Sequence, residues 1–172
     1  MHNKPDYPLI IRVLASGAVP AFLLITSCSA SGSGTAAPPA PPPCMPSRAA
    51  TASFVDVPEN GGVAYSQMIN GIVKGIPSAQ DAWLVVWPAL APAYWPQRDA
   101  LIPDMTGRFI AAADFGSNKF TNTGERFNLM IVEACPDASQ LFEQFNSTPQ
   151  IWGMSRLPSD TRILAQVTVR RD

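Results

Sequence analysis

The chain has 172 residues with 12 Lys or Arg, 13 Asp or Glu and a single His, so its net charge is −1. This composition lacks the basic surface that nucleic-acid binding requires, and we expect no nucleic-acid partner. Three cysteines and one histidine are also too few for a zinc site built from these residue types.

The first 28 residues combine a weakly positive start with a short apolar run. Lys4 and Arg12 precede the apolar run 13–28, which is shorter than the roughly 20 apolar residues of a membrane-spanning helix. This pattern is typical of a secretory signal peptide. The run ends in Ile25-Thr26-Ser27-Cys28, where an aliphatic residue and two small residues precede a cysteine.

This ending resembles the lipobox of bacterial lipoproteins. The resemblance implies that residues 1–27 are a signal peptide and that Cys28 becomes the lipidated first residue of an extracytoplasmic protein anchored to a bacterial membrane. The alternatives are an ordinary signal peptide cut near Ser29-Ala30, which would release the protein, and an uncleaved helix. Cleavage before Cys28 would remove the only histidine, His2, and would exclude mechanisms that require imidazole.

Residues 28–49 are rich in Ser, Gly and Pro and are predicted to form a flexible to extended tether before a domain over residues 50–172. With Cys28 lipidated, Cys44 and Cys135 remain, and two thiols in an oxidising compartment predict a disulfide. Such a bond would stabilise the domain by roughly 3–4 kcal/mol. The alternative is two free thiols.

The domain begins with short β-type runs separated by turn signals. We predict strands over residues 51–57, 63–73, 81–87 and 93–97. In the run 81–87 both alternating sets of side chains are apolar, so we expect a central strand covered on both faces. Gly71 predicts a bulge or a close packing point in the second strand, and Pro96 predicts that the fourth strand lies at a sheet edge.

Three further strands and one helix follow. The strands are predicted over residues 108–115, 126–134 and 162–170, the last with Ile163, Ala165, Val167 and Val169 facing inward. The helix is predicted to begin with Asp137 as its cap, with Gln140 placed for the return hydrogen bond, and to end by Pro149.

About seven short strands and one short α-helix predict an antiparallel β-sandwich. The stretches 71–77, 83–88, 94–97 and 124–127 are similar to an immunoglobulin-like domain that is common in bacterial extracytoplasmic proteins. This resemblance implies an immunoglobulin-like sandwich with Trp83 as its core tryptophan. It carries no activity over to this chain.

Few patterns in the domain predict chemistry. A pair of carboxylates could hydrolyse a glycosidic bond, and five acids lie near strand ends: Asp81, Asp99, Asp104, Asp114 and Glu125. Calcium could be held by Asp56, Glu59 and Asn60, but this segment is not a dense acidic loop. Because scattered loop acids are ordinarily solvated, we expect neither catalysis nor a metal or other cofactor.

The remaining candidates for binding are aromatic. We predict ligand contacts by Trp87, Tyr94, Trp95, Gln97 and Trp152, with Arg98 beside them. Aromatic faces next to amide and guanidinium donors can stack on a sugar or anchor a protein, whereas the alternative is that these rings pack the interior. Trp95 is the favoured contact because it precedes Pro96 on an edge strand.

These observations predict a non-catalytic envelope protein whose sandwich binds a protein partner. A cell-wall or polysaccharide-binding module that uses the aromatic residues is the alternative. A hydrolase with a carboxylate pair is the third reading, and it would require two acids about 5–10 Å apart in a cleft.

Overall fold

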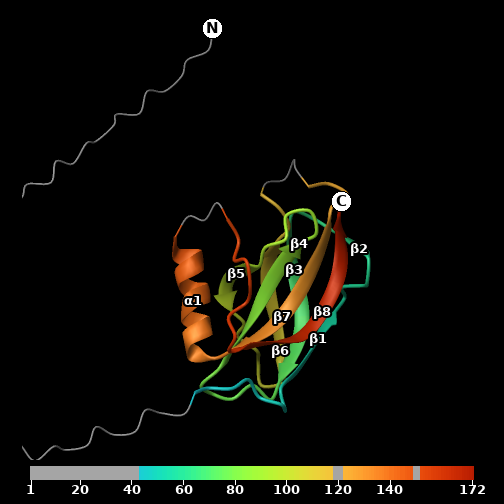
Figure 1. Ribbon diagram of the computed structural model, residues 1–172. Helices are drawn as coiled ribbons and strands as arrows, with labels where there is room; N and C mark the ends of the chain where they lie inside the picture. The colour runs from blue at the N-terminus through green and yellow to red at the C-terminus, as the bar shows by residue number, and fades with distance from the viewer. Residues whose placement is uncertain (1–42, 118–121, 149–151) are drawn as a thin grey trace, which may run out of the picture. The chain divides into compact units, whose positions relative to one another are not determined.

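The computed structural model describes residues 43–117, 122–148 and 152–172 (Figure 1). The predicted signal peptide, Cys28 and residues 28–42 of the predicted tether lie outside the described residues. No helix in the described ranges has the length and apolar character needed to cross a membrane. Within these ranges the chain forms eight strands and one α-helix, namely β1 (Thr51–Val55), β2 (Gly61–Val63), β3 (Ser66–Lys74), β4 (Asp81–Pro88), β5 (Trp95–Ala100), β6 (Arg108–Asp114), β7 (Arg126–Ala134), α1 (Pro136–Ser147) and β8 (Thr161–Arg171).

The strands form two sheets. Sheet A has three strands in the order β1-β3-β6, and sheet B has five in the order β2-β8-β7-β4-β5. The prediction of a mainly β fold with one short helix is therefore confirmed. The prediction that the strands are antiparallel throughout is wrong for β2, because residues 61–63 pair in parallel with residues 169–171 of β8.

The eighth strand arises where the predicted strand 63–73 changes sheet. Residues 61–63 belong to sheet B, and residues 66–74 belong to sheet A. Between them the Ala64 N–H donates to Oε1 of Gln67 at 3.1 Å, which helps to turn the chain. Apolar residues lie on both sides of this turn, so the sequence pattern does not reveal the break.

The main core lies between the two sheets. β4 contributes Leu84 and Val86 to it, and sheet A contributes Ile69 and Phe109. Gly71 lies directly against the Phe109 ring, and a Cβ at this position would overlap the ring. The predicted close packing point at Gly71 is therefore confirmed.

A second core lies between sheet B and α1, which Figure 1 shows alongside that sheet. The fully buried Trp83 packs edge-to-face on Phe142 with ring centroids 5.4 Å apart. Its indole N–H donates to the buried Ser139 hydroxyl at 3.0 Å, and this hydroxyl donates to the Asp81 carboxylate at 2.5 Å. Both faces of β4 are thus covered, as the sequence predicted.

The start of α1 differs from the prediction. Cys135 is the N-cap residue and the helix begins at Pro136, with no side-chain hydrogen bond from the cap. The prediction that Asp137 caps the helix is wrong, because this start places Asp137 inside the first turn. Instead, the Asp160 carboxylate accepts a hydrogen bond from the Ala138 N–H at 3.2 Å. A segment distant in sequence therefore satisfies one of the free N–H groups of the first turn.

A bulge in β8 alters the predicted inward face of that strand. The pairing of β7 with β8 skips Leu164, which gives β8 one extra residue at this point. Because an extra residue reverses the alternation of side chains, Leu164 packs against the main core and Ile163 is 43% exposed. The prediction that Ile163 faces inward is wrong, whereas Val167 and Val169 are buried as predicted.

A disulfide joins Cys44 to Cys135, with Cα atoms 6.0 Å apart, and confirms the predicted pairing. The two cysteines are 91 residues apart in sequence. For a loop of this length the chain-entropy estimate of stabilisation is roughly 4–5 kcal/mol. The bond indicates an oxidising, extracytoplasmic compartment.

An ion pair with a buried carboxylate also holds the segment before β1 to the domain. The Glu133 carboxylate is fully buried and accepts hydrogen bonds from the Ser47 N–H at 2.8 Å and from Nε of Arg162 at 3.1 Å. The Arg162 guanidinium also donates to the Ala50 carbonyl at 2.9 Å. These bonds connect β7 and β8 to residues 47–50. They also pair the buried Glu133 charge, which would destabilise the fold strongly if it had no partner.

Candidate functional site

Three of the four aromatic residues predicted as ligand contacts are half-buried in the structure. Trp87 and Tyr94 pack against the second core, and Tyr94 also forms an isolated β-bridge with Met154. Trp95 packs edge-to-face on Phe145 of α1, with ring centroids 5.8 Å apart. Much of each ring is therefore used in holding α1 and its flanking segments to sheet B, and ligand contact by these residues stays a prediction.

Trp152 differs from the other three, because 77% of its surface is exposed. The next residue, Gly153, lies against Trp95, and a Cβ on Gly153 would be 2.7 Å from atoms of the indole ring. The Trp152 side chain thus lies on the surface, and its neighbour in sequence packs against Trp95.

Gln97 joins the two sheets at one corner of the sandwich. Its Oε1 accepts a hydrogen bond from the Asp114 N–H of β6 at 2.8 Å, and its Nε2 donates to the Trp95 carbonyl at 2.9 Å. The Asn146 side chain of α1 donates to the carbonyls of Gln97 and Arg98 at 2.7 and 3.2 Å. These bonds connect the edge strand β5 to both β6 and α1.

A groove of about 1030 Å³, which we call the corner groove, lies at this corner. Its lining brings together Trp95, Gln97 and Arg98 of β5, Asn146 of α1, and the residues Asp114 and Glu125. The structure thus places two of the predicted contacts, Trp95 and Gln97, in one groove. The other three predicted contacts, Trp87, Tyr94 and Trp152, are not part of its lining.

Two of the five acids considered for a carboxylate pair, Asp114 and Glu125, line the corner groove. Glu125 is buried and accepts a hydrogen bond from the Asn122 side chain, whereas Asp114 is exposed. Of the residues considered for calcium, Glu59 accepts a hydrogen bond from the Thr168 N–H at 3.1 Å. Across the part of the chain that the structure describes, no three His, Cys, Asp or Glu side chains converge as metal ligands would.

The second candidate surface is the side of sheet A that faces away from the main core. Alternation along the paired strands places twelve side chains on or at the ends of this surface, which we call the outer sheet face: Thr51, Ser53, Val55, Ser66, Met68, Asn70, Ile72, Lys74, Arg108, Ile110, Ala112 and Asp114. Met68 is 56% exposed and Ile110 is 68% exposed. Exposed apolar side chains that cluster on one surface are typical of an interaction site.

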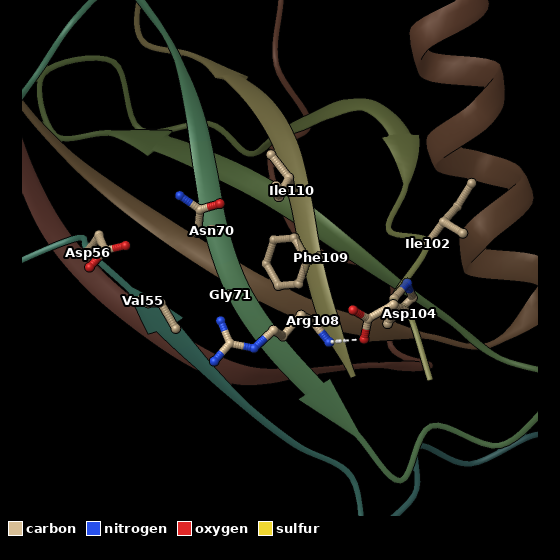
Figure 2. Close-up of a pocket in the computed structure, with 10 residues that line it drawn as sticks. Val55, Asp56, Asn70, Gly71, Ile102, Asp104, Arg108, Phe109 and Ile110 are labelled. Atoms are coloured by element: carbon tan, nitrogen blue, oxygen red, sulfur yellow. Dashed lines mark hydrogen bonds between the residues drawn. The ribbon is translucent and has the colours of Figure 1, made fainter. Parts of the chain in front are cut away.

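A hollow of about 570 Å³ deepens the outer sheet face. Figure 2 shows Ile110 beside the hollow and the Arg108 guanidinium extending across β3 toward Val55, away from Asp104. Asp56, which follows β1, also lines the hollow. The hollow therefore combines aliphatic side chains with charges of both signs.

Asp104 orders the turn that leads into β6. Its carboxylate accepts hydrogen bonds from the Thr106 hydroxyl and N–H, both at 2.7 Å, and from the Arg108 N–H at 3.0 Å. These bonds, that of the Thr106 hydroxyl above all, lower the pKa of Asp104 below its ordinary value. Asp104 therefore keeps its charge down to lower pH than a free aspartate and holds the chain beside the first residue of β6.

No family model matches this chain, no curated protein is significantly similar to its sequence, and no solved structure matches its fold. The resemblances to bacterial lipoproteins and to immunoglobulin-like domains therefore stay predictions.

Sequence reasoning missed the outer sheet face. Met68, Ile72 and Ile110 lie in strands, where an apolar residue ordinarily predicts a buried position. Only the pairing of β1, β3 and β6 shows that these side chains share one face, and only their exposure shows that the face is uncovered. No signal in the residues themselves distinguished them from core positions.

Proposed function

We propose that this protein is a non-catalytic, lipid-anchored cell-envelope protein whose β-sandwich binds a protein partner through the outer sheet face. The observation that supports this site is the exposure of Met68 and Ile110 beside Ile72 on one face of a three-stranded sheet. Burial of apolar surface against a partner stabilises a complex by roughly 25 cal/mol per Å² before the costs of association are subtracted.

The charges around this apolar cluster define the chemistry of the partner. Lys74 and Arg108 are exposed at one end of the outer sheet face, Asp114 is exposed at the other end, and Asp56 is exposed beside the middle of the face. A partner with aliphatic side chains between an acidic and a basic group would match this arrangement.

The anchor is supported by the lipobox resemblance of residues 25–28 and by the extracytoplasmic compartment that the disulfide indicates. We expect Cys28→Ala to release the protein from membranes or to block its processing, as measured by membrane fractionation and by the mass of the product. A Cys28→Ala protein that stays in the membrane fraction and is cut normally would contradict the anchor.

The partner site is tested with the full chain in its native cells. Complexes extracted in a mild detergent are compared by sedimentation for the unmodified protein and for the double variant Met68→Lys/Ile110→Lys. We expect the double variant to sediment as a smaller species. Binding of the partner would bury two lysine charges in an apolar contact, which destabilises the complex. Leu141→Lys is the matched control, since Leu141 is 47% exposed on α1. Equal sedimentation of all three proteins would contradict the site.

A second candidate function, binding of a cell-wall or other polysaccharide, is supported by the polar lining of the corner groove. Trp95, Arg98 and Asn146 lie together there. Retention on purified peptidoglycan and insoluble polysaccharides tests it, with Arg98→Ala as the variant, because Trp95→Ala would also remove the packing on Phe145. Weaker retention of Arg98→Ala would support this function, and flow-through of the unmodified protein would contradict it.

A further inference from the structure

We infer that the partner that fits the outer sheet face is a second copy of this chain, packed face to face about a two-fold axis that runs across the strands. This inference rests on the proposed function, because it names the partner of the same site. It depends on the distribution of charge, on the match of side chains and on the size of the face.

The outer sheet face has opposite charges at its two ends. Lys74 and Arg108 lie at one end, and Asp114 lies at the other. Asp56 follows Val55, which pairs with Asn70 at the middle of the face. Asp104 lies near Arg108, but its carboxylate is bonded within its own turn and the Arg108 guanidinium points away from it (Figure 2). Among the described residues, neither Arg108 nor Asp114 has an ion-pair partner in the chain.

A two-fold axis across the strands maps each end of the face onto the other. This rotation places Arg108 over Asp114 of the second copy, and by symmetry it places Asp114 over Arg108 of the second copy. An axis along the middle strand β3 would instead place the two Lys74 side chains over each other, which like charges oppose. The charges therefore select one direction of the axis.

The middle of the face also matches under this rotation. The register of β3 with β6 places Ile110 opposite Ala112 of the second copy and Met68 opposite Asn70 of the second copy. A large side chain thus meets a smaller one at both positions. Sheets that pack about 10 Å apart interdigitate in this manner.

The size of the face sets the expected strength of the contact. Three strands about seven residues long cover roughly 15 by 25 Å, by ordinary strand spacing and rise. This is about half of the ~800 Å² that each partner contributes to a standard interface. We therefore expect a weak dimer that is favoured where an anchor concentrates the chains on one membrane.

A second copy satisfies a condition that a different protein would have to meet independently. Any partner must present an acidic group over Arg108 and a basic group over Asp114, with aliphatic side chains between them. The chain itself already has this arrangement, so the two-fold operation makes the surface complementary to itself. This argument favours a second copy over an unrelated partner.

The test uses two differently tagged forms of the full chain produced in the same cells. A photoreactive side chain, p-benzoylphenylalanine, replaces Met68, and the expected product is an adduct that contains both tags. The same replacement at Leu141 on α1 is the matched control and should not give this adduct. An adduct with a different protein would overturn the inference and leave the proposed function standing, whereas the absence of any adduct from position 68 would contradict both.

Charge reversal tests the direction of the axis. Arg108→Asp alone or Asp114→Arg alone brings like charges together in both symmetry-related contacts, and we expect the yield of adduct to fall by about tenfold. The double variant Arg108→Asp/Asp114→Arg restores the pairing and should return the yield to within about twofold. A double variant as poor as the single variants, with an unchanged far-UV circular dichroism spectrum, would overturn the inference.

Discussion

Sheets A and B follow the same alternation of side chains, yet their outer faces have different surroundings. On sheet B, the outward residues Trp83, Val85 and Val132 are completely buried beneath α1. On sheet A, the outward residues Met68 and Ile110 are more than half exposed. Alternation decides which residues share a face, but the packing of a later segment decides whether that face is covered.

The composition of the two faces reflects this difference in part. The outward side of sheet B presents large aromatic and aliphatic groups to the helix, and the Trp83 indole N–H donates to Ser139 of α1. The outward side of sheet A mixes aliphatic residues with Asn70, Lys74 and Arg108. An apolar cluster with charges at its ends suits a surface that alternates between water and a partner better than a permanent core.

The largest expected effect is that of Trp83→Ala, which tests the side of sheet B that α1 covers. We expect the free energy of unfolding to fall by about 4 kcal/mol, because the change removes a fully buried aromatic ring and leaves a cavity under α1. Urea unfolding followed by circular dichroism measures the loss. Trp83→Phe is the matched control and should cost less, since it mainly removes the hydrogen bond to Ser139. A loss below about 1 kcal/mol for Trp83→Ala would show that α1 contributes little to the fold.

The inner side of sheet A is tested by Gly71→Ala. The added Cβ would overlap the Phe109 ring and approach the Ser53 carbonyl to 2.9 Å, so we expect a loss of about 2 kcal/mol from overpacking. The double variant Gly71→Ala/Phe109→Leu should be less destabilised than the sum of its two single variants. Simple additivity in urea unfolding would show that the ring is not the obstacle.

The outer sheet face is tested by Ile110→Ser. Because this side chain is 68% exposed, we expect the stability of the isolated chain to change by less than about 0.5 kcal/mol. The contrast with Trp83→Ala would show that the apolar groups on the outer sheet face are not required for folding. A loss comparable to that of a core residue would instead indicate that the face packs within its own chain.

The smallest expected effect is the dependence on pH at the turn before β6. Folding lowers the pKa of Asp104 through its bonds to Thr106 and Arg108. Its charged form therefore stabilises the fold above the ordinary aspartate value, and this contribution is lost as the pH falls through the lowered value. We expect Asp104→Asn to unfold at a lower temperature near neutral pH, with the difference narrowing below about pH 4. A difference that persists unchanged into strong acid would contradict this role.

The corner groove shows how far ligand contacts could be predicted from the sequence. The residues Trp95 and Gln97 were identified for ligand contact, and the structure does place them in one groove. The amide of Gln97, however, is occupied by β6 and by its own strand, and the Trp95 ring packs on α1. Residue type and strand position indicated that these groups were special, but not that their partners lay within the chain.

The sequence by itself determined the elements whose signals are local. Apolar residues on both alternating faces predicted a central strand over 81–87, alternation predicted a strand over 126–134, and Gly71 predicted a close packing point. With Cys28 expected to be lipidated, the two remaining cysteines predicted the disulfide. Each of these predictions depends on a short sequence pattern or on residue chemistry, and none of them requires knowing which distant segments pack together.

Only the tertiary structure decided the features that depend on contacts between distant segments. The chain changes sheet between residues 63 and 66, Leu164 rather than Ile163 faces the core, and Asp160 rather than Asp137 caps α1. The uncovered outer sheet face belongs to the same group. In each case more than one residue or segment could occupy the same position. Which one does so depends on the free energy of the whole packed fold and not on any short stretch of residues.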